Sequence, residues 1–139
     1  MITNPIAIFG GTFNPIHYGH LRLAEEWRQA FALPCVHLLP AGLPPHRPAP
    51  RVSPLQRLAM VRLAIEGDPC LKVDTRDVLK SSPCYSIETV HSLRQEFGAT
   101  RPIYWLMGAD SFLTLPQWEE WQTLMSLVHI VVAHRPSYM

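Results

Sequence analysis

A short apolar run that ends in two glycines and leads into an amphipathic segment opens this chain, and it constrains the fold more than any other feature. Residues 6–9 read Ile-Ala-Ile-Phe and are followed by Gly10-Gly11. A run of this kind is typical of a strand buried on both faces, as parallel strands are. From His20 to Phe31 the apolar residues recur at helical spacing, and a second apolar run follows from Val36 to Leu39. Strand, glycine turn, helix and strand in this order predict a right-handed parallel crossover.

The same alternation continues along the rest of the chain. Further helices are predicted between Ser53 and Gly67, at 86–97 with Ser86 as its cap, and at 118–125; further strands are predicted at 71–73, 103–107 and 129–133. The residues of the second helix that are expected to face the core are Leu55, Leu58, Ala59, Val61, Leu63 and Ile65. We therefore predict an α/β fold with a doubly wound parallel sheet, formed by residues 1–139 as one domain.

Three polar or glycine-containing segments follow predicted strands directly. They are Gly10-Gly11-Thr12 after the first strand, the loop from Ala41 to Pro54 after the second, and Gly108-Ala109-Asp110 after the fourth. The loop contains five prolines, which exclude a helix or an inner strand there. Ligands of doubly wound sheets bind beyond the carboxyl ends of the strands. The three segments are therefore expected to form one site.

Composition narrows the partners that such a site could serve. The chain is 47% hydrophobic and 17% charged, with a net charge of +1, so it has no overall field for gripping nucleic acid or a membrane surface. No apolar run approaches the ~20 residues that cross a bilayer. The three cysteines are odd in number and form no CxxC motif, which indicates a reducing compartment. We expect a soluble cytoplasmic protein with a nucleotide ligand; the sequence carries no signal for its oligomeric state.

The segment from Gly10 to His20 carries the strongest chemical signal. Two glycines let the backbone approach a ligand closely, and the start of a helix favours an anion. His17 and His20 are three residues apart, so both imidazoles can face one side and stabilise developing charge. Taken alone, these residues favour phosphate binding but leave open two structural histidines or a zinc pair, although no third metal ligand lies nearby. The segment matches neither GxGxxG nor the P-loop pattern.

The whole string GGTFNPIHYGH closely resembles the GGTFDPxHxGH signature of nicotinate-nucleotide adenylyltransferases, which belong to the HxGH nucleotidyltransferase superfamily. Asn14 stands where many members have Asp, a mild departure because both side chains stabilise turns. The resemblance implies that His17 and His20 are catalytic, because the family's histidines contact ATP phosphates and stabilise the transition state. The ATP-binding residues that it implies in this segment are Gly10, Gly11, Thr12, Phe13, His17 and His20.

Three further segments resemble the same family. Residues 44–47 are similar to its P-x-H-K segment, which adds His46 and Arg47 to the expected ATP site; by themselves they would be a solvated surface patch. Residues 53–60 are similar to a helix start in which Arg57 is architectural. The stretch 77–90 is similar to one in which a Tyr-Thr pair lines the pyridine pocket, a role that falls here to Tyr85 and Ser86. Without the family, that pair would be a packed tyrosine and a helix cap.

The last matching block, 108–121, resembles G-x-D-S…L-P-x-W-x-x-W. By this resemblance Gly108 and Asp110 belong to the ATP site, with the Asp110 carboxylate on a ribose hydroxyl, and Trp118 stacks on the pyridine ring. Trp121 is expected in the core. The residues alone would place both tryptophans there.

The resemblance implies a Rossmann-like nucleotidyltransferase fold and transfer of AMP from ATP to nicotinate mononucleotide, which gives deamido-NAD and pyrophosphate in NAD biosynthesis. Mg²⁺ is expected to arrive with ATP, since the sequence offers no carboxylate cage for it. Family members continue into a segment with an S-S-T-x-x-R type motif, so this chain is expected to be the amino-terminal two-thirds, truncated after the fifth strand. A catalytically silent nucleotide-binding fragment, or another HxGH enzyme such as a pantetheine-phosphate adenylyltransferase, remain alternatives.

Overall fold

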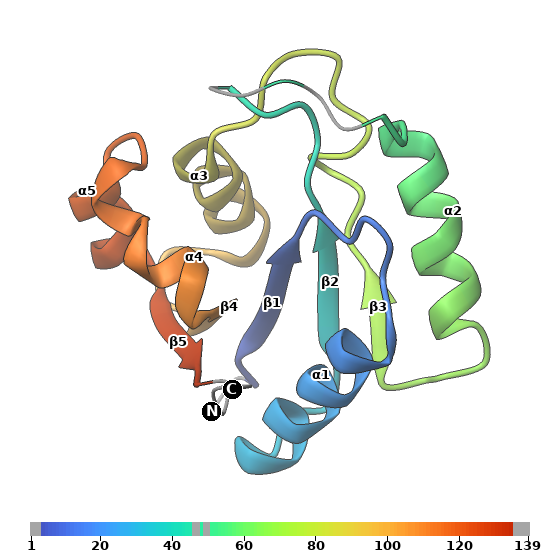
Figure 1. Cartoon of the computed structure of the whole chain (residues 1–139). Helices are drawn as coiled ribbons and strands as arrows, with labels where there is room; N and C mark the ends of the chain where they lie inside the picture. Colours follow the sequence, from blue (N-terminus) through green and yellow to red (C-terminus); the bar gives the residue numbers. More distant parts are fainter. Residues whose placement is uncertain (1–3, 46–47, 49–50, 135–139) are drawn as a thin grey trace.

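Five parallel strands form one sheet in the order β3-β2-β1-β4-β5 (Figure 1). The computed structural model describes residues 4–45, 48 and 51–134. The strands are β1 (Ile6–Gly11), β2 (Val36–Pro40), β3 (Leu71–Val73), β4 (Ile103–Gly108) and β5 (His129–Ala133). The sheet therefore starts at its centre and is wound outward in both directions, as the doubly wound prediction requires.

Helices cover both faces of this sheet (Figure 1). They are α1 (Tyr18–Ala30), α2 (Pro54–Ile65), α3 (Ser86–Phe97), α4 (Ala109–Leu113) and α5 (Trp121–Leu127), with a 3₁₀ turn, η1 (Leu115–Gln117). In β1, Ala7 and Phe9 pack in one buried cluster with α1 and α2, whereas Ile6 and Ile8 pack in the other with α3, η1 and α5. Because successive side chains of a strand point to opposite faces, the apolar run of β1 joins the two halves of the core.

Two helix predictions were wrong in ways that matter for the site. In α2, Leu55 and Leu63 are 64% and 70% exposed, whereas Arg57 is fully buried. The buried face repeats every four residues through Arg57, Val61 and Ile65, so the two leucines lie on the opposite side. A second error concerns α3, where Tyr85 is the N-cap and makes no side-chain capping bond. Ser86 is therefore the first helical residue and not the cap.

The helix predicted at 118–125 begins three residues later, at Trp121, and ends at Leu127. Residues 109–113 form α4, which the sequence reading missed; η1 follows, and α5 starts only at Trp121. Trp118 lies between the two with an extended backbone (φ −77°, ψ 145°), and Glu120 has a left-handed φ of 49°. These conformations end one helical segment and start another. The apolar pattern alone could not place the break.

Candidate functional site

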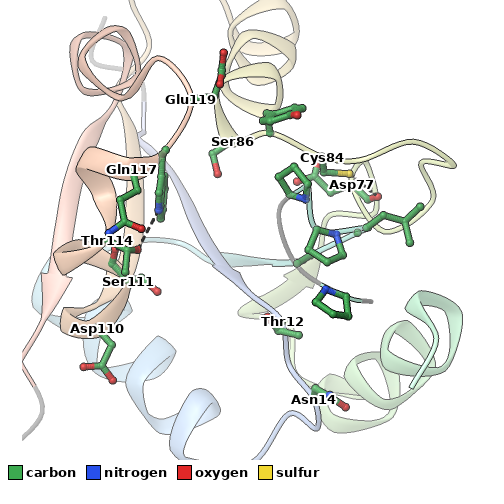
Figure 2. A pocket seen from close by; sticks show the side chains of 18 residues that line it. Thr12, Asn14, Asp77, Cys84, Ser86, Asp110, Ser111, Thr114, Gln117 and Glu119 are labelled. Carbon is green, nitrogen blue, oxygen red and sulfur yellow. Dashed lines mark hydrogen bonds between the residues drawn. The ribbon is translucent and has the colours of Figure 1, made fainter. Parts of the chain in front are cut away.

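A cleft of 870 Å³ opens at the carboxyl edge of the sheet (Figure 2). Thr12 and Asn14 follow β1, the segment 41–45 follows β2, and Asp110 and Ser111 follow β4; all of them line the cleft. The three segments that the sequence placed at one site do meet there. The wall also includes Asp77 and Cys84 after β3, and Figure 2 shows these across the cleft from Ser111, Thr114 and Gln117.

The turn after β1 is tight and packs on itself. A Cβ atom on Gly11 would lie 3.0 Å from two carbons of the Phe13 ring, and Phe13 has a left-handed φ of 51°. The Phe13 ring is buried and meets the rings of Phe9 and His20 edge to face, with centroids 5.5 and 5.0 Å apart. Thr12 lines the cleft, whereas only the backbone of Phe13 remains for the nucleotide contact predicted for that residue.

His17 and His20 form the start of α1 together. The Gly19 N–H donates to His17 Nδ1 and the His17 N–H donates to His20 Nδ1, both at 3.1 Å, and the rings are stacked with centroids 3.8 Å apart. Nitrogens that accept a hydrogen bond carry no proton, so each neutral ring holds its proton on Nε2. His17 therefore caps one of the N–H groups of the helix start with its own side chain. Neither histidine is among the residues that line the cleft.

Tyr85, Ser86 and Trp118, predicted to bind the pyridine, all line the cleft. Ser86 projects into the cleft from the first turn of α3 (Figure 2). The Trp118 indole N–H donates to Thr114 Oγ1 at 3.1 Å, the dashed line in Figure 2. Trp118 is half-buried against the core cluster beneath α3 and α5. The hydrogen bond and this packing fix the orientation of a flat apolar face at the cleft wall.

Asp77 carries a buried carboxyl group and also lines the cleft. It is 9% exposed, and the Thr89 hydroxyl donates to it from 2.8 Å. Burial raises the pKa of Asp77 above its ordinary value, and the Thr89 bond opposes this only in part. The sequence reading assigned Asp77 no role in the site, because its partner lies 12 residues away in α3 and no local pattern joins the two.

The segments after β2 and β3 pack closely against the backbone of Asp77. The Cys84 N–H donates to the Leu43 carbonyl at 2.9 Å, and the Cys84 thiol donates to the Asp77 carbonyl at 3.4 Å. Gly42 is buried against the same place: its missing Cβ atom would lie 2.3 Å from the Asp77 carbonyl oxygen. Burial also raises the pKa of the Cys84 thiol, which keeps it protonated and makes it a poor nucleophile.

Two other predicted ATP-binding residues lie at the end of β4. Gly108 is the last residue of that strand and the N-cap of α4. Asp110 is exposed in the first turn of α4 and lines the cleft, where its carboxylate can accept hydrogen bonds. His46 and Arg47 lie outside the described residues, although Pro45 and Pro48 on either side line the cleft.

Arg57 is the functional candidate that the sequence reading set aside as architectural. Its Nη1 donates to the Thr12 carbonyl at 2.7 Å, and its side chain is fully buried. Burial lowers the pKa of the guanidinium. A signal was present in the sequence. Arg57 precedes Val61 and Ile65 at helical spacing and therefore lies on the same buried face of α2.

No group of three or more His, Cys, Asp or Glu side chains in the described ranges is arranged to hold a metal ion. None of the helices in the described part of the chain combines the length and apolar character needed to cross a bilayer.

A model of the cytidylyltransferase-like family matches residues 8–139, which is nearly the whole chain. The chain belongs to this family. Among its relatives, the probable nicotinate-nucleotide adenylyltransferase of Yersinia enterocolitica is 48% identical over 132 residues, and that of Hahella chejuensis is 46% identical over 136 residues. The resemblance drawn from the sequence is thereby confirmed. This cytidylyltransferase-like chain is covered to 95% and 97% in the two alignments, but it spans only 60% and 62% of the relatives' lengths.

A solved structure shares the fold. The nicotinic acid mononucleotide adenylyltransferase of Plasmodium falciparum, determined with NaAD, superposes on this cytidylyltransferase-like chain with a TM-score of 0.73 at 13% identity. The superposition covers 99% of this chain and 78% of that one. At so low an identity the likeness concerns the fold alone, and it confirms the Rossmann-like prediction.

Proposed function

We propose that this chain carries the substrate cleft of an adenylyltransferase that moves AMP from ATP to nicotinate mononucleotide, giving deamido-NAD and pyrophosphate in NAD biosynthesis. The observation that carries the proposal is the set of residues that line one cleft. Thr12 and Asp110, expected to contact ATP, share the cleft with Tyr85, Ser86 and Trp118, expected to contact the pyridine nucleotide. The relatives that are 46–48% identical to this chain are named as probable nicotinate-nucleotide adenylyltransferases, which supports the same substrates.

In this reaction the protein has to position the two substrates, and none of its side chains has to act as a nucleophile. A phosphate oxygen of the mononucleotide attacks the α-phosphorus of ATP, a P–O bond forms, and the bond to pyrophosphate breaks. Donors beside the phosphates stabilise the charge that develops. The Nε2–H groups of His17 and His20 are suited to that role, because each ring accepts a backbone hydrogen bond at its other nitrogen. The remaining ATP contacts that we propose are Gly10, Gly11, Thr12, the Phe13 backbone, His46, Arg47, Gly108 and Asp110.

For the pyridine nucleotide we propose an aromatic platform. Trp118 offers a flat face whose indole N–H is already bound to Thr114, so the ring can stack on a heterocycle without losing a polar partner. Ser86 projects from the first turn of α3 into the cleft, where its hydroxyl can reach the ligand, and Tyr85 is the N-cap of the same helix (Figure 2).

We further propose that Mg²⁺ enters as a complex with ATP. The carboxylates that line the cleft are Asp77, Asp110 and Glu119; the first is engaged with Thr89, and the three do not form a cluster that could hold an ion. Such donors fit a metal whose remaining ligands come from phosphates and water. Mg²⁺ supplies neutralisation of the phosphate charge when bound. We also propose a cytoplasmic location, which fits the free state of Cys35, Cys70 and Cys84. Small-molecule partners, with neither nucleic acid nor membrane, fit the net charge of +1.

The test is whether the chain forms deamido-NAD from ATP and nicotinate mononucleotide. The product is separated by chromatography, and the release of pyrophosphate is measured in the same reaction. Parallel thermal-shift measurements use ATP, nicotinate mononucleotide and phosphopantetheine. We expect stabilisation by the first two. Stabilisation by phosphopantetheine in place of nicotinate mononucleotide would refute the substrate assignment. Binding of both substrates without product would favour a catalytically silent fragment, a reading suggested by the 60% coverage of the relatives.

A further inference from the structure

The guanidinium of Arg57 lies beneath the turn that follows β1. The residue comes from the first turn of α2 and is fully buried. Its Nη1 reaches across 45 residues of sequence to the Thr12 carbonyl. Within the described ranges, Nε and Nη2 of Arg57 have no hydrogen-bond partner. A buried cation normally has a paired anion, because an unpaired one is costly to remove from water.

The bond to Thr12 sets the direction of one peptide group. In a trans peptide the carbonyl and the following N–H point opposite ways. Since the Thr12 carbonyl points to Arg57, the Phe13 N–H points away from the guanidinium. A charged donor on the carbonyl also polarises the peptide and makes that N–H a stronger donor. The next residue, Phe13, has a φ of 51°, a conformation that bulky side chains rarely adopt without support from their surroundings.

The charge of Arg57 adds to this geometric effect. The ion pairs found among the described residues involve Arg22, Arg28, Arg76 and Lys80, and none includes Arg57. The guanidinium therefore adds positive potential below a turn whose Thr12 lines the cleft. Charges act more strongly in a site shielded from water.

We infer that Arg57 is a positioning residue of the triphosphate site, which holds the Thr12–Phe13 peptide with its N–H toward the anion and supplies a positive charge from below. This inference rests on the proposed function, since it assumes that the turn receives the phosphates of ATP. It assigns Arg57 no contact with the reacting atoms.

The experiment compares two substitutions with a matched control on the same helix. Arg57→Gln keeps a donor for the Thr12 carbonyl but removes the charge, and Arg57→Lys keeps the charge but loses the planar fork. Arg62→Gln removes a charge from an exposed position of α2. Dissociation constants for ATP and for nicotinate mononucleotide are measured separately by calorimetry on the 139-residue chain, with folding checked by circular dichroism.

We expect Arg57→Gln to weaken ATP binding by about tenfold or more, Arg57→Lys by less, and Arg62→Gln hardly at all, while binding of nicotinate mononucleotide changes by less than about twofold. ATP affinity in Arg57→Gln equal to wild type, or an equal loss for both ligands, would overturn the inference. Should Arg57→Gln not fold, Arg57→Lys decides by the same selectivity for ATP. A wild-type chain that binds ATP but not nicotinate mononucleotide would defeat the proposed function and leave the Arg57 comparison intact; one that binds neither defeats both.

Discussion

Replacement of Gly42 by Ala tests the close contact between the segments that follow β2 and β3. The added Cβ atom would lie 2.3 Å from the Asp77 carbonyl oxygen and 2.7 Å from Cys84 Sγ. Sγ belongs to a side chain and can move, but the carbonyl belongs to the backbone of a buried residue. That backbone would have to retreat by about 1 Å to restore van der Waals contact, and overpacking of this kind costs about 1–3 kcal/mol or more.

Gly108→Ala provides the matched control. Its added Cβ atom would meet nothing within 4 Å, and its φ of −77° suits alanine. The left-handed glycines of the described chain are Gly67 and Gly98, so neither Gly42 nor Gly108 requires glycine for its φ. Both substitutions reduce the entropy of the unfolded chain equally, an effect that stabilises by about 0.4–1 kcal/mol. The difference between the two variants therefore isolates the contact at Asp77.

We expect that difference to be about 1–3 kcal/mol or more, which lowers the melting temperature of Gly42→Ala by roughly 4–12 °C relative to Gly108→Ala. Thermal and urea unfolding followed by circular dichroism measure it. Binding of nicotinate mononucleotide should weaken as well in Gly42→Ala, because Asp77 and the first turn of α3 would shift together through Thr89. Equal melting temperatures for the two alanine variants would refute the reasoning from close approach.

Three further predictions concern the cleft and its wall. His20→Ala should lower turnover by about 10²–10³-fold, the usual effect of losing one donor to a transition state. His20→Glu, whose carboxylate can keep the capping box but donates no hydrogen bond, should be at least as slow. Steady-state rates at wild-type level in these variants would exclude the donor role. Trp118→Ala should weaken nicotinate mononucleotide binding by about tenfold or more, since stacking contributes ~1–3 kcal/mol. Trp118→Phe should keep much of the affinity. An unchanged calorimetric affinity in the alanine variant would mean that the ring has a purely structural role. Because burial raises the pKa of Asp77 above 3.8, the folded chain holds a proton that the unfolded chain releases, so stability should fall as the pH rises from 3.8 through the raised value. Asp77→Asn should flatten this part of the melting-temperature profile and exposed Glu66→Gln should not; an Asp77→Asn profile as steep as wild type would contradict the assignment.

The fold was largely predictable because parallel strands are buried on both faces. The inner strands β1, β2 and β4 then appear in the sequence as mainly apolar runs. All five predicted strands, at 6–9, 36–39, 71–73, 103–107 and 129–133, lie within observed strands. The errors arose where a residue's burial depends on distant partners. Arg57 lies on the buried face of α2, where its guanidinium donates to the Thr12 carbonyl. Thr12 is far away in the sequence, so no local apolar pattern indicates this contact.

The site was predictable only as far as its residues are close in sequence. The turn after β1 and the Trp118 block could be assigned from local patterns, and their partial convergence in one cleft follows from the order of the strands. Asp77 with Thr89, and Gly42 against Asp77, join different segments, so nothing in either segment alone marks the contact. The roles of His46 and Arg47 stay predictions.

The two stacked imidazoles at the start of α1 have a consequence for ligand affinity. The Nδ1 atom of each ring accepts a hydrogen bond from a backbone N–H, so the rotamer of each ring is fixed when the chain folds, before a ligand binds. An incoming anion would meet side chains that have little freedom left to lose, and less of the interaction free energy would be spent on immobilising them. Preorganisation of this kind favours tight binding of one class of ligand over weaker binding of many different ligands.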